Sequence, residues 1–262
     1  MTPICDDLEK VGYHVLPQFL TDADCDAMKD ILTSLPAEQV VANQSGDFHG
    51  GRTVLAPNII IHSERFLDLA TDRRVLSVAN KFFEFGTFKN EKDPYQLHLM
   101  HARMVAEEAD EQELHIDSRL CGVNPPLILH IFFYLEDCLD EGSGATRVVP
   151  GSHRYMRYSE PSDNANAIPV LGKKGTAIFI NSNTYHGSSA KTSAGERWLI
   201  TLAFSRWWIR QPFAIPYFPH WPRQLTAEEK NLFGFNNYAD KSLSSRGLRA
   251  RGELPSLVPT EN

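Results

Sequence analysis

The chain has 262 residues and a formal net charge of −7 at pH 7. Its length suits one β-barrel domain, and its hydrophobic share of 42% is enough for an extended apolar core. The negative charge disfavours a nucleic-acid-binding surface, because binding to phosphates needs concentrated lysine and arginine. No apolar run reaches the roughly 18 residues that cross a bilayer, and no export signal opens the chain, so we expect a cytoplasmic protein without a membrane partner.

The four cysteines are scattered along the chain and form no C-x-x-C pair. They are Cys5, Cys25, Cys121 and Cys138. This spacing favours reduced thiols over a disulfide framework or a zinc site made of cysteines, which agrees with an intracellular setting.

Two N-terminal segments have the pattern of helices. The segment 21–36, "TDADCDAMKDILTSLP", opens on Thr21 and Asp22 as capping candidates and ends at a proline. The segment 63–83, "SERFLDLATDRRVLSVANKFF", predicts one long helix that begins after Ser63. We therefore expect a helical N-terminal support over about residues 1–93.

The helix start at Ser63 also explains an H-x-E pair, His62 and Glu64. A glutamate in the first turn is favoured by the exposed amides and the helix dipole. We therefore interpret this pair as part of a helix start and not as metal ligands.

From about residue 94 the sequence changes to β-strand patterns. The four strand candidates are residues 95–105, 127–137, 175–186 and 197–208. Several short strands without intervening helices predict a barrel or sandwich core over about residues 94–210. The proline- and aromatic-rich extension 211–262 is expected to wrap the barrel, close over a cavity or meet a partner. The whole chain, 1–262, then forms a single domain.

A metal-binding pattern lies in "ELHIDSRL", residues 113–120. In extended backbone, His115 and Asp117 point to the same side, so both can face one cavity. A third candidate, His186, ends the strand "GTAIFINSNTYH". Two imidazoles and one carboxylate with open positions suit non-haem Fe(II), or Mn(II), better than the thiolate-rich sites of structural zinc.

An anion anchor follows the third candidate ligand. Arg197 comes eleven residues after His186, and a hairpin through residues 188–196 would place the two nearly opposite each other. A guanidinium there binds a carboxylate bidentately beside the metal. A structural metal site would instead be closed, which separates the enzyme reading from a non-catalytic β-barrel binding protein.

These residues, with the segment "EGSGATRVVPGSH" and the run from His186 to Ser188, resemble the phytanoyl-CoA dioxygenase (PhyH)-like family of Fe(II)- and 2-oxoglutarate-dependent oxygenases. The resemblance covers roughly residues 8–210. It implies a mainly β fold with flanking helices, built on a double-stranded β-helix (jelly-roll, cupin-like) core.

The resemblance also implies roles for individual residues. His115, Asp117 and His186 would ligate Fe(II), and Arg197 would bind the far carboxylate of 2-oxoglutarate. The family's co-substrate pocket would further include Ser188, Met100, Phe133 and His98.

The reaction that the family pattern implies is an oxidation with O2. 2-Oxoglutarate would give succinate and CO2 while an unactivated C–H of a small or mid-sized metabolite or biosynthetic intermediate is hydroxylated. The same machinery also serves desaturation, cyclisation or epoxidation, and these alternatives stay open. The carboxylate of Asp117 points away from a halogenase, and the short loop after it contains no recognisable CoA-binding stretch.

Substrate contacts are the least specified part of the pattern. Arg119, two residues after Asp117, is a candidate at the cavity mouth, and Arg103 is a second candidate for an anionic substrate group. The expected partner is a small molecule, and the expected assembly is a monomer or a homodimer.

Overall fold

A computed structural model describes residues 3–43, 51–84, 87, 93–118, 120–235 and 237. Its core consists of two antiparallel sheets. The larger sheet contains, in spatial order, β1 (Tyr13–Leu16), β9 (Ala177–Asn181), β6 (Ile128–Tyr134), β11 (Arg197–Arg206), β4 (Tyr95–Val105), β3 (Thr53–Ala56) and β2 (Val41–Asn43). The smaller sheet contains β5 (Gln112–His115), β10 (His186–Ser188), β7 (Thr146–Val148) and β8 (Ile168–Pro169). This is the predicted mainly β, jelly-roll architecture.

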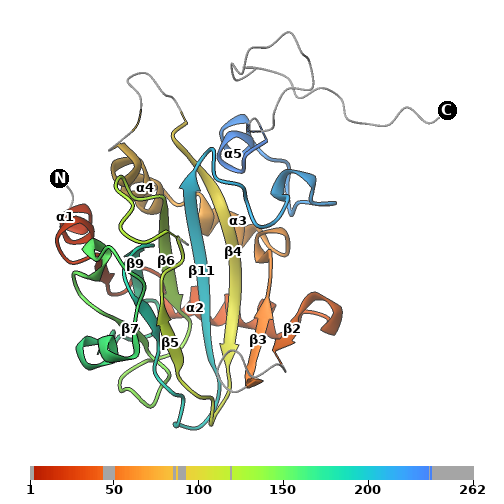
Figure 1. Cartoon of the computed structure of the whole chain (residues 1–262). Coiled ribbons are helices and arrows are strands. Elements are labelled where there is room, and N and C mark those ends of the chain that lie inside the picture. The colour runs from red at the N-terminus through yellow and green to blue at the C-terminus, as the bar shows by residue number, and fades with distance from the viewer. Residues whose placement is uncertain are drawn as a thin grey trace.

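Helices cover the outer face of the larger sheet, whereas β5 and β7 lie over its other face (Figure 1). The α-helices are α1 (Pro3–Lys10), α2 (Asp22–Thr33), α3 (Glu64–Ala70), α4 (Arg73–Glu84) and α5 (Ala227–Leu232). The 3-10 helices are η1 (Ala37–Gln39), η3 (Ile59–Ile61), η4 (Ser152–Arg154), η5 (Pro161–Asn166) and η6 (Ile215–Tyr217). Within the described ranges, no helix has the length and apolar character needed to cross a bilayer.

The N-terminal segments form the predicted helices with one difference. Thr21 caps α2 and shares a capping box with Asp24, as its position indicated. The predicted long helix 63–83 is two helices, α3 and α4, because the Asp72 carboxylate accepts a hydrogen bond from the Arg74 amide at 2.7 Å and starts a new helix. The N-terminal region also contributes β1, β2 and β3 to the larger sheet, so it is more than a helical support.

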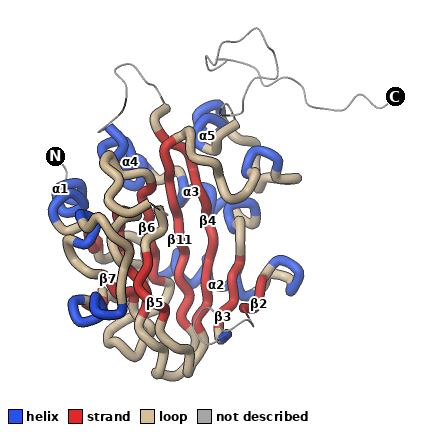
Figure 2. The backbone as a smooth tube through the Cα atoms, in the orientation of Figure 1, coloured by secondary structure: helices blue, strands red, loops and turns tan. Residues whose placement is uncertain are grey.

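The two long strands β4 and β11 run side by side through the molecule (Figure 2). Side chains alternate between the two faces of the larger sheet. On β6, Phe132 and Tyr134 pack between the sheets with apolar residues of β7, β9 and β11. Leu129, Ile131 and Phe133 instead join the core under the helices.

This alternation corrects the expected positions of Met100 and Phe133. Both are buried in the core under the helices, and the Phe133 ring lies 5.3 Å from the ring of Phe19. Neither faces the inter-sheet space that holds Phe132. Because neighbouring residues on a strand point to opposite faces, a one-residue shift in the assignment exchanges a pocket residue for a core residue.

The predicted hairpin between His186 and Arg197 is also wrong. β10 pairs with β5 and β7, whereas β11 pairs with β4 and β6. Residues 189–196 therefore connect one sheet to the other. His186 and Arg197 lie on facing sheets instead of on adjacent strands of one sheet.

The C-terminal extension wraps the outer face of the molecule as far as residue 235. Phe233 belongs to the core under the helices, and its ring stacks on Trp221 with centroids 5.3 Å apart. Gln211 donates from Nε2 to the Leu97 carbonyl of β4 at 2.6 Å. Of the three roles expected for this extension, wrapping the barrel is the one that the described residues show.

Replacing Phe133 tests its assignment to the core under the helices. Phe133→Ala should lower the free energy of unfolding by about 3–5 kcal/mol, because the change leaves a cavity in a fully buried site. Chemical denaturation measures this loss. A loss below about 1 kcal/mol, the range of surface substitutions, would contradict the assignment.

Candidate functional site

Three metal-ligand side chains meet where the two short strands β5 and β10 pair. His115 is the last residue of β5, His186 is the first of β10, and the two are opposite each other in the register. The His186 Nε2 lies 3.0 Å from Asp117 Oδ2, and the His115 Nε2 lies 3.7 Å from Asp117 Oδ1. In the part of the chain that the structure describes, these residues form the one group of at least three ligand atoms lying within 4.8 Å of one another.

Backbone carbonyls fix the tautomer of both histidines. The Nδ1 of His115 lies 3.0 Å from the Glu113 carbonyl, and the Nδ1 of His186 lies 2.9 Å from the Thr184 carbonyl. A carbonyl oxygen only accepts, so each Nδ1 carries the hydrogen and each Nε2 keeps its lone pair. Both lone pairs therefore face the Asp117 carboxylate, as a shared metal ion requires.

The protonation states also suit a metal. Burial opposes the ionisation of Asp117, but His130 and His186 outweigh it and hold the pKa of this carboxyl well below its usual value. Burial lowers the pKa of His115 to about 4, so its imidazole is neutral at physiological pH. Burial lowers the pKa of His186, and the Asp117 carboxylate more than restores it, so the pKa is raised overall. Two imidazoles and a carboxylate are the donor set that non-haem Fe(II) prefers.

The P-G-S-H segment supports the backbone next to His186. Ser152 is fully buried, and its Oγ accepts a hydrogen bond from the Tyr185 amide at 2.8 Å and donates to the Val149 carbonyl at 2.6 Å. Because Tyr185 directly precedes His186, the hydroxyl fixes the entry of β10. The segment thus acts on the site through the backbone and not by contacting a metal.

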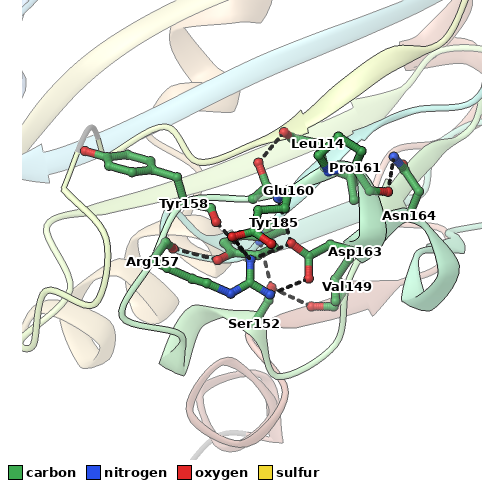
Figure 3. A network of polar contacts seen from close by, with 11 residues as sticks. Leu114, Val149, Ser152, Arg157, Tyr158, Glu160, Pro161, Asp163, Asn164 and Tyr185 are labelled. Atoms are coloured by element: carbon green, nitrogen blue, oxygen red, sulfur yellow. Dashed lines mark hydrogen bonds and ion pairs between the residues drawn. The ribbon is translucent and has the colours of Figure 1, made fainter.

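A polar network joins the end of β5 to the start of β10, where the two candidate histidine ligands lie (Figure 3). Arg157 makes a two-fold ion pair with Asp163, with distances of 2.7 and 2.8 Å, and its carbonyl accepts from the Tyr185 hydroxyl at 2.6 Å. The Ser159 hydroxyl donates to the Leu114 carbonyl at 2.6 Å. Leu114 and Tyr185 directly precede the two histidine ligands, so this network ties β5 and β10 to the same loop.

Arg197 opens β11 on the face that looks toward the smaller sheet. Its side chain is almost fully buried, its Nη2 donates to the Gly144 carbonyl at 2.5 Å, and its Nε has no hydrogen-bond partner. A buried guanidinium with an unsatisfied donor suits an anionic ligand. Ser188, also buried, is two residues beyond His186 on β10, opposite Thr146 of β7.

Arg103 is a half-buried residue of β4 near the start of β11. It is opposite Leu199 on β11 and hence diagonal to Arg197 on the same face. Burial, and then the positive charge of Arg197, lower the pKa of Arg103. The second candidate for substrate contact is therefore a neighbour of the anion anchor. The other candidate, Arg119, lies outside the described residues.

His98 faces the inter-sheet space because β4 contains a bulge. The register with β11 shifts between Ala203 and Phe204, which leaves His98 as the extra residue, and its Nδ1 lies 3.1 Å from the Ser205 hydroxyl. Burial is the main cause that lowers its pKa to about 4. The bulge places His98 on the opposite face of the sheet from Met100.

Two neighbours of the ligands were not singled out from the sequence. The Nδ1 of His130 lies 2.8 Å from Asp117 Oδ2, and the Phe132 ring lies 5.7 Å from the ring of His186. Because side chains alternate along β6, His130 and Phe132 share one face of the strand. To see that this face looks toward Asp117, one must know the order of the strands.

A separate cavity of about 820 Å³ opens beside α1 and the end of α4. Asn181 and Asn183 form part of its wall, together with the loop 122–126. The Asn183 amide donates to the Val123 carbonyl at 2.9 Å, which fixes this loop. None of the three candidate metal ligands lines the cavity.

Removing the Ser152 hydroxyl tests its support of β10. Ser152→Ala should lower the free energy of unfolding by about 1–3 kcal/mol, because it leaves the buried Tyr185 amide without an acceptor. Denaturant titration measures the change. Ser34→Ala removes an exposed hydroxyl bond and serves as the matched control. Equal losses in the two variants would contradict the role of Ser152.

The neutral histidines inside the barrel predict a pH dependence of folding. Burial lowers the pKa of His98 to about 4 and that of His101 to about 3, whereas an unfolded histidine titrates near 6.5. The unfolded chain thus binds more protons below pH 6.5, so the free energy of unfolding should fall as the pH falls from about 6.5 to about 3. His101→Gln should make this fall shallower in denaturant titrations. The same slope in the wild type and the variant would contradict the prediction.

Comparisons with known proteins agree with this geometry. A family model described as phytanoyl-CoA dioxygenase (PhyH) matches residues 8–198. The chain is 22% identical to the dioxygenase FUM3 of Gibberella moniliformis over 260 residues, which cover 94% of this chain and 86% of that protein.

Solved structures with a similar fold also come from this kind of enzyme. HygX from Streptomyces hygroscopicus, with nickel, 2-oxoglutarate and hygromycin B bound, is 16% identical, with a TM-score of 0.66 over 80% of this chain and 89% of that chain. The non-haem, α-ketoglutarate-dependent epimerase SnoN from nogalamycin biosynthesis is 17% identical, with a TM-score of 0.66 over 86% and 93%. The chain belongs to the phytanoyl-CoA dioxygenase family and is an Fe(II)- and 2-oxoglutarate-dependent dioxygenase.

Proposed function

We propose that the enzyme hydroxylates an unactivated C–H bond of a small or mid-sized metabolite or biosynthetic intermediate. The observation that carries this proposal is the Asp117 carboxylate between two histidines whose Nε2 lone pairs face it. Membership of a dioxygenase family disfavours the alternative of a non-catalytic binding barrel.

His115, Asp117 and His186 would hold Fe(II), and Arg197 would bind the 5-carboxylate of 2-oxoglutarate. When bound, the iron and 2-oxoglutarate supply O2 activation, with succinate and CO2 as products. The chain's own residues would bind the metal and 2-oxoglutarate and orient them. The buried Arg197 guanidinium offers a donor to the carboxylate, and Ser188 adds a hydroxyl beside it.

Apolar side chains and neutral imidazoles lie around the proposed co-substrate site. Phe132, Tyr134 and Leu199 form an apolar layer between the sheets, on the same face as Arg197. His98 and His101 are neutral at physiological pH because burial lowers their pKa values. The burial of Arg197 strengthens its interaction with a carboxylate, since the local dielectric is low.

The substrate class rests on the fold neighbours. HygX holds hygromycin B, and SnoN acts in nogalamycin biosynthesis, so both are associated with small natural products. The corresponding substrate for this chain is a soluble small molecule, and the corresponding location of the enzyme is intracellular. Epimerisation, the reaction of SnoN, shows that the same fold supports outcomes other than hydroxylation. Desaturation, cyclisation or epoxidation is therefore the second proposal. The mass of the product separates desaturation and cyclisation, which remove hydrogen, from hydroxylation, which adds an oxygen. NMR of the product separates epoxidation, which also adds an oxygen.

Removing the carboxylate tests the metal site. Asp117→Ala should abolish stoichiometric Fe(II) binding in anaerobic calorimetry and all turnover of 2-oxoglutarate, because two imidazoles alone hold the ion weakly. Circular dichroism should show an intact fold. Asp30→Ala, on the exposed face of α2, is the matched control. Full metal binding by the Asp117 variant would refute the ligand role.

Removing the guanidinium tests the co-substrate site separately. Arg197→Gln should weaken 2-oxoglutarate binding by about 10- to 100-fold, because the 5-carboxylate loses a charge-assisted partner. Fe(II) affinity without 2-oxoglutarate should stay unchanged. Arg65→Gln, in an exposed ion pair with Asp24, controls for the loss of a positive charge. Unchanged 2-oxoglutarate affinity in the Arg197 variant would remove this residue from the site.

A further inference from the structure

His130 is a third histidine in the neighbourhood of Asp117. It lies in the middle of β6, opposite Ala203 of β11 and Ile180 of β9, and its side chain is only 6% exposed. Its Nδ1 is 2.8 Å from Asp117 Oδ2, which is closer than either of the two ligand histidines comes to that carboxylate. A contact this short between buried polar groups is specific to the pair.

The geometry separates His130 from the metal ligands. The group whose ligand atoms lie within 4.8 Å of one another contains His115, Asp117 and His186, but not His130. The His130 ring lies 6.4 Å from the ring of His186, whereas the rings of His115 and His186 are 4.4 Å apart. His130 thus contacts the Asp117 carboxylate without belonging to the group of candidate metal ligands.

His130 has no competing partner among the described residues. Both of its ring nitrogens are buried, neither makes a regular hydrogen bond, and Nδ1 lies at ion-pair distance, 2.8 Å, from Asp117 Oδ2. Buried polar atoms are nearly always satisfied in proteins, so an exception indicates a functional constraint.

A carboxylate ligand needs such a partner. Asp117 Oδ1 faces His115, while Oδ2 is near both His130 and His186, so the carboxylate has more than one way to meet an ion. A donor on one oxygen restricts the rotation and leaves the other oxygen for the metal. Partners of this kind orient ligands, and their loss costs metal affinity.

We propose that His130 is a positioning residue that donates from Nδ1 to Oδ2 of Asp117 and holds the carboxylate in the orientation that binds the metal. This inference rests on the proposed metal site at His115, Asp117 and His186. It assigns to His130 a role through Asp117, without direct coordination.

Three variants at this position separate the donor from the ring. His130→Asn keeps an N–H close to the place of Nδ1, His130→Gln moves it toward the place of Nε2, and His130→Leu removes it. Cobalt(II) is a suitable probe, because its visible spectrum reports the coordination sphere and its binding needs no turnover. Each protein is titrated with cobalt(II) after metal removal, and its thermal unfolding is measured in the metal-free state.

Metal affinity should follow the position of the donor. The Leu and Gln variants should bind cobalt(II) about 10- to 100-fold more weakly than the wild type, and the Asn variant should stay within a few-fold. The wild type and the Asn variant should give the same cobalt spectrum, since the ligands are the same.

Two results would overturn the inference. Wild-type affinity in the Leu variant would show that the contact with Asp117 positions nothing. Equal weakening in all three variants, with a changed cobalt spectrum in the Asn variant, would make His130 a direct ligand. In both cases the wild type binds the metal and the proposed function stands, whereas a wild type that binds no cobalt(II) would refute the metal site itself.

Discussion

The pairing of β5 with β10 is the interaction on which the site depends. It puts His115 directly opposite His186, although the two are far apart in the sequence. The strands are short, so the pairing needs help from outside the sheet. The loop that carries Arg157 and Ser159 bonds to the residues that precede both histidines. The Ser152 hydroxyl also bonds to the backbone of Tyr185, directly before β10. The positions of the candidate metal ligands therefore depend on backbone hydrogen bonds outside the ligand side chains.

Charge is organised around that pairing in two separate regions. At one end, Asp117 is ionised, the His115 imidazole is neutral, and backbone carbonyls set the tautomers of His115 and His186. At the other end, Arg197 and Arg103 bring two guanidiniums to one face of the larger sheet. An apolar layer that includes Phe132 and Leu199 lies between the sheets. A ligand with a metal-chelating end and an anionic end matches this division, which is the chemistry of 2-oxoglutarate.

Local patterns in the sequence predict part of this arrangement. The strands 95–105 and 197–206, the cap at Thr21 and the two-residue spacing of His115 and Asp117 depend only on neighbouring residues. The choice of candidate ligands needed no knowledge of the sheets, because residue type and order are visible along the chain. The core of two sheets agrees with the barrel or sandwich that the short strands without helices between them predicted.

The register and partners of the strands, and the contacts between distant residues, could not be predicted from the sequence. The face of Phe133 depends on an odd or even count along β6, and the family resemblance does not fix that count. The segment between His186 and Arg197 has the composition of a hairpin, yet it crosses between sheets, because each strand finds a different partner. The contact of His130 with Asp117 can be found only when the order of the strands is known.

The most direct test of the central claim is an anaerobic titration of the metal-free enzyme with Fe(II) and then 2-oxoglutarate, followed by visible absorption. An Fe(II) site with open positions and a nearby carboxylate anchor predicts a weak charge-transfer band that appears only when both are present. Its intensity should saturate at one equivalent of each. Folded protein that binds neither component, and shows no band, would contradict the metal site at His115, Asp117 and His186.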